Sequence, residues 1–163
     1  NHNYCFTTTA LTSKIWWIYE DENGEWQAKP IADIGDASKI PLPVDISISS
    51  DDQLLWVDTW HDGKTRVFDI SVPEKAFQIY EKKIGNQINM LSQSWDGKRV
   101  YFTSSLLDNW DMREGEEGDL QYFKAYNWNG SSLEHKFSID FIKEKLGSPH
   151  QMRFGSHSLY AMQ

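Results

Sequence analysis

The chain has 163 residues, among them eight Trp, eight Phe and seven Tyr, and its formal net charge is −8. Aromatic side chains bury large areas and favour strands, so a disordered chain is excluded. The 24 acidic residues outnumber the 16 basic ones, and no basic stripe runs along any segment, which argues against binding to a nucleic-acid backbone.

The cysteine count and the hydropathy of the chain exclude further kinds of site and structure. Cys5 is the only cysteine, so no internal disulfide and no Cys-based zinc site can form. It lies in "NYCFTTT", which predicts a strand with a buried, inert thiol. No apolar run approaches the roughly 18 residues that span a bilayer, and no targeting signal is visible, so periplasmic and cytoplasmic locations both stay open. The opening "NHNYCF" lacks an initiator Met, and we expect a processed chain, a split subunit or a fragment.

The predicted elements begin with a hairpin. "KIWWIYEDENGEWQAKPIADI" reads as two strands joined at Asn23-Gly24, a dipeptide typical of hairpin turns. A second hairpin, "LQYFKAYNWNGSSLEHKFSID", turns at Asn129-Gly130. Between them the acidic segment 112–119 reads as a solvated loop, with an ion site as the alternative. After them, 141–147 predicts one short helical turn closed by Gly147.

An internal repeat organises the centre of the chain. "DISISSDDQLLWVDTW" from Asp45 matches "MLSQSWDGKRVYFTSS" from Met90, a shift of 45 residues. In each copy a short strand runs into a turn built on Asp51 or Asp96, and a strand rich in aromatic and β-branched residues follows. Because the acid recurs at the turn, we interpret Asp51 and its neighbour Asp52 as turn residues rather than as a general acid and base.

Units of about 40–50 residues made of short antiparallel strands are typical of β-propeller blades. The sequence therefore predicts an all-β chain of about three blades, at roughly 1–40, 41–85 and 86–163. Three blades do not close a ring, since propellers have typically four to eight. We expect the remaining blades of a probable seven-bladed propeller to come from a missing segment or a partner chain.

Several stretches resemble one known family, the selenium-binding proteins, which include the bacterial methanethiol oxidases. "PLPVDISISSDDQLLWVDTWHDGKTRVFDISVP" is similar to a signature of that family. "SLLDNWD" followed downstream by "HQMR" is the more specific pair, because "DGKRVYFT" is common to many propellers. The order of the matches resembles the C-terminal part of a family member. The chain departs from the family in a shorter connection at "EKAFQIYEKKI", in the loop "MREGEEGD" and in the ending "GSHSLYAMQ".

The resemblance implies a seven-bladed propeller and, for the methanethiol oxidases, a copper-dependent oxidation of a small thiol to an aldehyde, hydrogen sulfide and hydrogen peroxide. It implies a metal site built from histidines, of which one, that of the closing motif, falls on His150. Imidazole is a good copper ligand, and a thiolate is a soft ligand suited to copper. His150 follows a Gly-Ser-Pro turn and precedes an alternating segment, so we place it at the start of a strand near the channel; a histidine bonded to a loop carbonyl is the alternative.

The other candidates are weaker. Asp45 precedes an apolar alternation and either faces the channel or ties adjacent blades together. Trp60 and Trp110 end equivalent segments and either pack between blades or form a pocket wall. His157 is a possible second member of the site. The remaining histidines, His2, His61 and His135, are expected at turns, on the surface or in structural positions.

Two further functions stay open. The altered loops and ending favour a non-catalytic propeller that serves as a binding or metal-handling scaffold. A propeller hydrolase or lactonase with a divalent ion is a third possibility, but it calls for several channel-facing carboxylates, of which Asp45 alone can be nominated.

Overall fold

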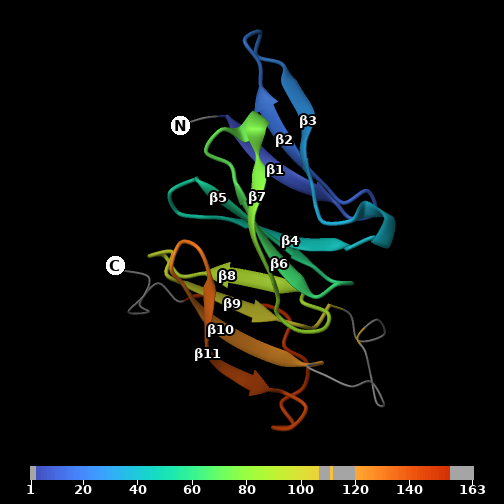
Figure 1. Ribbon diagram of the computed structural model, residues 1–163, viewed down its shortest axis with the longest axis vertical. Coiled ribbons are helices and arrows are strands. Elements are labelled where there is room, and N and C mark those ends of the chain that lie inside the picture. Colours follow the sequence, from blue (N-terminus) through green and yellow to red (C-terminus); the bar gives the residue numbers. More distant parts are fainter. Residues whose placement is uncertain (1–2, 107–110, 112–119, 155–163) are drawn as a thin grey trace.

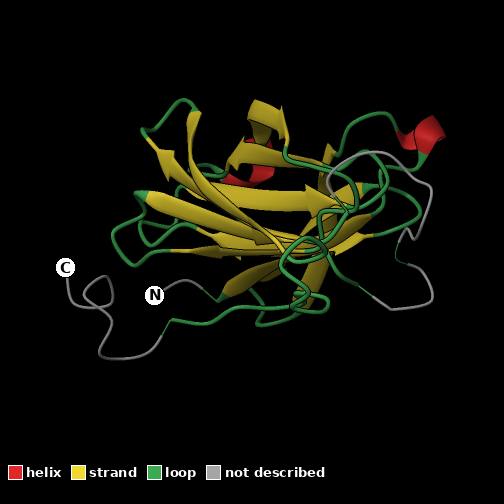
Figure 2. Cartoon of the chain, turned by 90° about the horizontal axis from the view of Figure 1, so that it is seen from below, coloured by secondary structure: helices red, strands yellow, loops and turns green. Residues whose placement is uncertain are grey.

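The computed structural model describes residues 3–106, 111 and 120–154. Strands and loops make up this part of the chain, with only two short helical segments, η1 (Ala37–Lys39) and η2 (Pro73–Lys75) (Figure 2). No helix within the described ranges is long and apolar enough to cross a membrane. The prediction of an all-β chain is therefore confirmed.

The strands form three antiparallel sheets that follow one another along the long axis of the molecule (Figure 1). The first sheet has the strand order β1-β2-β3, the second β4-β5-β6-β7 and the third β11-β10-β9-β8. Their strands are β1 (Tyr4–Thr9), β2 (Lys14–Glu20), β3 (Trp26–Asp33), β4 (Pro43–Ile48), β5 (Leu54–Thr59), β6 (Lys64–Asp69), β7 (Phe77–Lys83), β8 (Met90–Gln93), β9 (Arg99–Thr103), β10 (Tyr122–Trp128) and β11 (Leu133–Asp140).

Within each sheet, sequential strands pair as neighbours, which is the meander that hairpin turns produce. The first strand of each sheet lies innermost, because β1 lies against β4 and β4 lies against β8. Both predicted hairpins are present, as β2–β3 and β10–β11. The predicted helical turn after β11 is a single turn, in which Leu146 N–H donates to Phe141 O at 2.9 Å and Gly147 has a positive φ of 90°.

The repeated turns use the same hydrogen bonds in both copies. Ser49 Oγ donates to Asp51 Oδ1 at 2.5 Å, and Ser94 Oγ donates to Asp96 Oδ1 at 2.5 Å. The same hydroxyl oxygens accept from the backbone N–H groups of Leu54 and Arg99. The sequence repeat is therefore also a structural repeat, and the interpretation of Asp51 and Asp96 as turn residues is confirmed.

Two apolar clusters hold the sheets together. The first lies between the first and second sheets and contains Phe6, Ile15, Ile34, Leu55, Val57, Phe68 and Ile70. The second lies between the second and third sheets and is more aromatic, with Trp56, Phe102, Tyr122, Tyr126 and Trp128 among its members. Alternate residues of β5 belong to different clusters, as the two-residue period of a strand requires. The second sheet is thus covered on both faces.

The prediction of a buried Cys5 was wrong. Cys5 alternates with Phe6 along β1, and while Phe6 enters the first cluster, Cys5 is exposed. The thiol lies on the face of the first sheet that no described residue covers.

Candidate functional site

The candidate site lies where the innermost strand β8 begins and the segment 149–154 passes alongside it. Thr103 Oγ1 donates to His150 O at 2.7 Å, and Ser105 N–H donates to Pro149 O at 3.0 Å. These two hydrogen bonds fix the backbone of residues 149–150 against the end of β9. They bring together segments that are more than forty residues apart in the sequence.

The His150 ring is oriented by a backbone carbonyl. Its Nδ1 lies 2.7 Å from Ser105 O. A carbonyl oxygen can only accept, so an Nδ1 that carries the proton donates to it, and in that tautomer the Nε2 lone pair is free to bind a metal or accept a proton. A carbonyl held on the second ring nitrogen is the usual arrangement for a metal-ligating histidine. The residue is exposed in this chain, so Nε2 is accessible.

The expectation that His150 begins a strand was wrong. Residues 149–154 have no strand assignment. The contacts of the segment with β8 and β9 use side chains in place of a backbone ladder: Ser92 Oγ donates to Met152 O at 3.3 Å, as Thr103 Oγ1 does to His150 O. The segment lies beside the sheet without joining it.

Ser105 is itself held by two buried polar residues. Asn89 Nδ2 donates to Ser105 O at 2.6 Å, so this carbonyl accepts from both Asn89 and His150. Asp111 accepts from Ser105 Oγ at 2.5 Å and from Leu106 N–H at 3.0 Å. The "SLLDNWD" and "HQMR" motifs, which are separate in the sequence, therefore meet at Ser105.

Sequence reasoning did not select Asn89, Ser105 or Asp111. One signal was available for Asn89: under the 45-residue shift it aligns with Val44, so a polar residue stands where the other copy has an apolar one. Asn89 is fully buried, which a solvated loop amide would not be. For Ser105 and Asp111 no comparable signal exists, because their partner positions are set by the tertiary contact.

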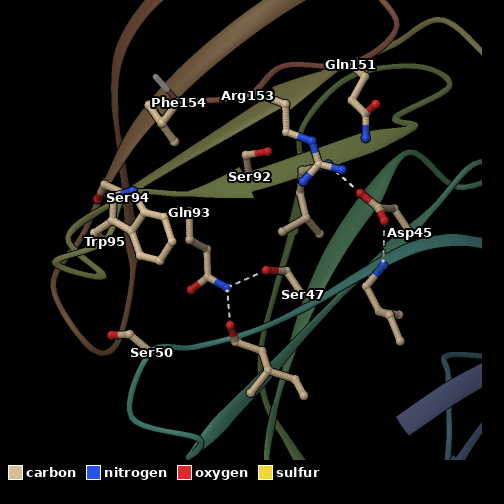
Figure 3. A pocket seen from close by; sticks show the side chains of 13 residues that line it. Asp45, Ser47, Ser50, Ser92, Gln93, Ser94, Trp95, Gln151, Arg153 and Phe154 are labelled. Atoms are coloured by element: carbon tan, nitrogen blue, oxygen red, sulfur yellow. Dashed lines mark hydrogen bonds between the residues drawn. The ribbon is translucent and has the colours of Figure 1, made fainter. Parts of the chain in front are cut away.

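Asp45 ties the second sheet to the third. Its Oδ2 accepts from Leu91 N–H of β8 at 2.9 Å, and its Oδ1 accepts from Ile46 N–H at 3.0 Å. The guanidinium of Arg153 points toward the same carboxyl (Figure 3). Burial raises the pKa of Asp45 above its ordinary value, while the two N–H groups and the Arg153 charge act in the opposite direction.

Asp58 lies beside Asp45, one strand further into the sheet. The two are register partners across β4 and β5, and Asp58 is fully buried. Burial raises the pKa of Asp58 well above its ordinary value, and the neighbouring Asp45 charge adds to the shift. Thr65 on β6 opposes it, although its hydroxyl makes no well-formed hydrogen bond with either carboxyl oxygen among the described residues. A neutral Asp58 follows, because an unpaired buried carboxylate is costly.

A cavity of about 420 Å³ runs along the seam between β4 and β8, with residues 151–154 on its other side (Figure 3). Asp45 and Arg153 lie at one end, and Ser50 and Trp95 lie at the other. Gln93 crosses the seam and donates to Ser47 Oγ at 2.8 Å and to Ile48 O at 3.1 Å. This amide and the Asp45 carboxyl each form hydrogen bonds between the second and third sheets.

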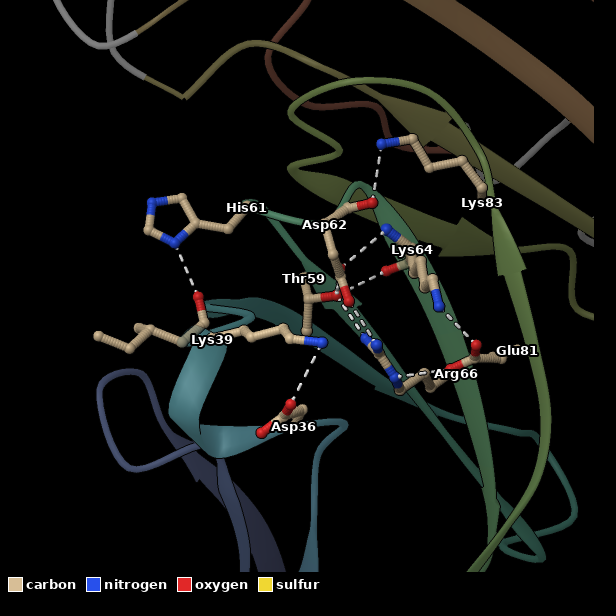
Figure 4. Close-up of polar contacts among 10 residues, drawn as sticks. Asp36, Lys39, Thr59, His61, Asp62, Lys64, Arg66, Glu81 and Lys83 are labelled. Atoms are coloured by element: carbon tan, nitrogen blue, oxygen red, sulfur yellow. Dashed lines mark hydrogen bonds and ion pairs between the residues drawn. The ribbon is translucent and has the colours of Figure 1, made fainter.

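A second polar cluster surrounds Arg66, which is 2% exposed (Figure 4). The guanidinium donates to Thr59 Oγ1 at 2.6 Å and to Asp62, and its Nε lies 3.2 Å from Glu81 Oε2 in an ion pair. The hydrogen bond from Lys64 lowers the pKa of Glu81, and the Arg66 charge lowers it further. Every charge here has an opposite neighbour, so the cluster is structural.

The remaining sequence candidates lie apart from this site. Trp60 is buried at 6% exposure. Among the other histidines, the Nδ1 of His61 lies 2.7 Å from Ile40 O in a turn, and the Nε2 of His135 lies 2.7 Å from Ser138 Oγ on β11. Trp110, His157 and His2 fall outside the described residues.

One described side chain, His150, has the chemistry of a metal ligand. His150 has the held ring and free Nε2 that a ligand needs, but no group of three His, Cys, Asp or Glu side chains gathers in the described ranges. The described residues therefore offer one possible metal ligand. Ser105 contacts its ring, and Asn89 and Asp111 hydrogen-bond to Ser105.

Comparisons with known proteins identify the family to which the chain is similar. Residues 1–89 match the 56 kDa selenium-binding protein family. The chain is 63% identical over 161 residues to a methanethiol oxidase of Ruegeria pomeroyi, covering 99% of this chain and 36% of that protein. It is 57% identical over 155 residues to a methanethiol oxidase of a Hyphomicrobium species, covering 95% of this chain and 35% of that protein. The chain thus spans about a third of the length of these relatives.

Solved structures agree on the fold. A hypothetical selenium-binding protein from Sulfolobus tokodaii is 31% identical with a TM-score of 0.67, covering 81% of this chain and 36% of that one. The Swd1 β-propeller domain of Myceliophteria thermophila, at 12% identity and a TM-score of 0.62, covers 85% of this chain and 42% of that one, and supports the fold alone. The three sheets are blades of a partial β-propeller, and the chain belongs to the 56 kDa selenium-binding protein family.

Proposed function

We propose that the chain is part of a methanethiol oxidase-like enzyme that converts a small thiol, dioxygen and water to an aldehyde, hydrogen sulfide and hydrogen peroxide. The observation that carries the proposal is the 63% identity, over nearly the whole chain, to a protein named methanethiol oxidase. The orientation of His150 supports it, because the ring is held as a metal ligand requires.

Copper is the metal that we propose for the site. Imidazole suits copper, and copper also accepts a soft thiolate, so the metal would supply the redox chemistry for the thiol and dioxygen. His150 would bind through Nε2 while Ser105 O holds Nδ1. The described residues offer one ligand, so the others would come from further parts of the propeller.

Further blades are the partners that we propose for this chain, and seven blades in all are expected. The third sheet has an apolar hollow of about 720 Å³ on its outer side, lined by Tyr101, Ala125 and Phe137 among others. The opposite face of the first sheet exposes Cys5. Propeller blades bury such faces against their neighbours, so further blades would cover both.

A non-catalytic scaffold is the second candidate. The observation that favours it is the departure from the family in the connection "EKAFQIYEKKI", the loop "MREGEEGD" and the ending "GSHSLYAMQ". A scaffold of this kind would keep the propeller and the cavity of Figure 3 without releasing peroxide.

Metal analysis and a peroxide assay on the full-length protein test the proposal. We expect copper near one per propeller and peroxide release when methanethiol is added. His150→Ala should lower both, whereas His61→Ala should change neither. His61 is a matched control, since its Nδ1 also lies 2.7 Å from a loop carbonyl and the residue is also exposed. A metal-free protein that releases no peroxide would support the scaffold.

A further inference from the structure

We infer that Asp45 and Arg153 are a positioning pair, which fixes segment 149–154, and with it His150, across the seam between the second and third blades. The inference rests on the proposed function for the metal, but the position of the segment can be tested without a metal. It concerns what holds the segment in place and not the chemistry of the imidazole.

Segment 149–154 lies beside the third blade without a strand assignment. Thr103 Oγ1 and Ser92 Oγ donate to two of its carbonyl groups, at 2.7 Å and 3.3 Å. Ser105 N–H donates to Pro149 O at 3.0 Å. A segment that is held by side chains and a single backbone hydrogen bond from the described part of the third blade should open more readily than a strand inside a sheet. A further contact can therefore change how often it opens.

The Asp45 carboxyl joins three elements. It belongs to β4 of the second blade, and its Oδ2 accepts from Leu91 N–H on β8 of the third blade at 2.9 Å. The guanidinium of Arg153, from segment 149–154, points toward the same carboxyl (Figure 3). Burial raises the pKa of Asp45, and the Arg153 charge acts in the opposite direction, as an attraction between opposite charges does. The position of the segment is thereby coupled to the packing of the two blades.

The alternative is a surface ion pair that fixes nothing. Arg153 is exposed, and pairs of exposed charges often contribute nothing measurable, in part because both side chains lose freedom on pairing. Asp45 differs from a surface acid, because it is half-buried and its two oxygens already accept from Leu91 N–H and Ile46 N–H. The carboxyl is held before Arg153 approaches, so less freedom is lost and the attraction acts on the segment.

The test is amide hydrogen exchange in the metal-free, full-length protein at about pH 8, which favours the ionised carboxyl. Ser105 N–H reports the segment, because it donates to Pro149 O, and Leu91 N–H reports Asp45. Arg153→Gln removes the charge from the segment and leaves the Leu91 hydrogen bond in place. Ser105 N–H should therefore exchange about 2–5-fold faster, as the loss of one ion pair predicts, while Leu91 N–H is unchanged.

Two further variants test the charge itself. Asp45→Asn keeps an oxygen that can accept from Leu91 N–H but carries no charge, so it should speed the exchange of Ser105 N–H as Arg153→Gln does. Arg153→Lys keeps the positive charge and should restore exchange close to that of wild type. The double variant Asp45→Asn/Arg153→Gln should match the single variants, because losing one partner already removes the pair.

Salt separates an ion pair from lost packing. Raising the ionic strength from about 0.1 M to about 1 M shortens the Debye length from about 10 Å to about 3 Å. Exchange of Ser105 N–H in wild type should then approach that of Arg153→Gln, whereas Arg153→Gln and Asp45→Asn should not respond. A merely structural residue would change the exchange rate without changing its dependence on salt.

Gln93→Leu is the control for the seam. It removes two hydrogen bonds across the same seam, to Ser47 and Ile48, and none to segment 149–154 in the described ranges. It should lower the free energy of unfolding and leave the local exchange of Ser105 N–H and its salt dependence unchanged. Equal acceleration in Gln93→Leu and Arg153→Gln would overturn the inference, because any weakening of the seam would then release the segment.

Copper binding separates the inference from the proposed function. An open segment reduces the apparent affinity by the fraction that is open, so the copper affinity of Arg153→Gln should fall by no more than the factor seen in Ser105 exchange. Faster exchange in a protein that binds no copper would support the inference and contradict the oxidase. Unchanged exchange in both Arg153→Gln and Asp45→Asn would overturn the inference even in an active oxidase.

Discussion

The chain has two seams, one between the first and second blades and one between the second and third. Both are packed with apolar side chains, but their buried polar groups have different partners. The seam between the first and second blades packs aliphatic residues with Phe6 and Phe68, and its buried Arg66 meets Thr59, Asp62 and Glu81. The seam between the second and third blades is more aromatic. It leaves both Asp58 oxygens without a hydrogen-bond partner in the described ranges.

The two seams therefore differ in how their most deeply buried charged group is compensated. Buried polar groups in native proteins are usually satisfied, and the exceptions often have a role in binding or catalysis. The buried Arg66 has carboxylate partners in Asp62 and Glu81, although its Nε forms an ion pair with Glu81 without a hydrogen bond in the described ranges. The second seam also carries the unpartnered Asn89 Oδ1, on the residue that contacts the His150 ring. Four predictions test this contrast.

The largest effect is expected from removing one aromatic ring in each seam. Phe68 is 1% exposed in the first cluster and Phe102 is 0% exposed in the second. Phe68→Ala and Phe102→Ala should each lower the free energy of unfolding by about 3–5 kcal/mol, because both leave a cavity in a dense core. Denaturant unfolding measures this. A much smaller loss for one variant would show that its seam is loosely packed.

Gly63→Ala should have the next largest effect, because it disturbs the second seam through the backbone. Gly63 has a φ of +62°, and a Cβ there would lie 1.8 Å from Gly85 O. Overpacking costs typically about 1–3 kcal/mol, and the left-handed conformation adds about 1–2 kcal/mol for alanine. Thermal unfolding should show a clear loss. The control is Gly97→Ala, where φ is also positive, at +67°, but no atom lies within 4 Å of the added Cβ.

Asp58→Asn should change how stability depends on pH. Burial raises the pKa of Asp58 in the folded state, so its contribution to stability is fully present below the unfolded pKa of about 3.9 and is lost as pH rises through the folded pKa. The slope reaches at most about 1.4 kcal/mol per pH unit. Asparagine does not ionise, so the free energy of unfolding of the variant should rise relative to that of wild type between pH 5 and pH 8.

Urea unfolding at those two pH values measures the gain. A wild type whose stability does not fall relative to Asp58→Asn over that range would mean that Asp58 is ionised and paired. The buried charge of the second seam would then be compensated by a partner, as the Arg66 charge of the first seam is.

Asp51→Asn should give the smallest effect, with the opposite sign. The Ser49 hydroxyl and the Gln53 N–H lower the pKa of Asp51, so its contribution is present above a pH of about 4 and is lost as pH falls through the folded pKa. The turn is solvent-exposed, so screening keeps the effect below about 1 kcal/mol. Asp96→Asn, in the repeated turn, should match it in acid unfolding curves. Unequal effects would show that the two turns are not energetically equivalent.

Much of the fold was predictable, because it depends on interactions that are local in sequence. Asn23-Gly24 and Asn129-Gly130 identify two hairpins, and the recurrence of Ser49–Asp51 as Ser94–Asp96 identifies the repeated turn. The exposure of Cys5 was missed, because alternation along a strand does not say which face a neighbour covers. The strand expected at His150 was wrong, because the contacts of this segment are made by side chains of distant residues.

The sequence by itself determined the hairpins, the repeated turns and the blade-like repeat, since each follows from spacing within a few residues or one period. The choice of His150 came from the resemblance of "HQMR" to a family motif. Only the tertiary structure decided that Asn89, Ser105 and Asp111 lie behind that histidine and that Asp58 is buried beside Asp45. Such contacts join residues tens of positions apart across a seam, and the seam forms only when two sheets bury their apolar faces together.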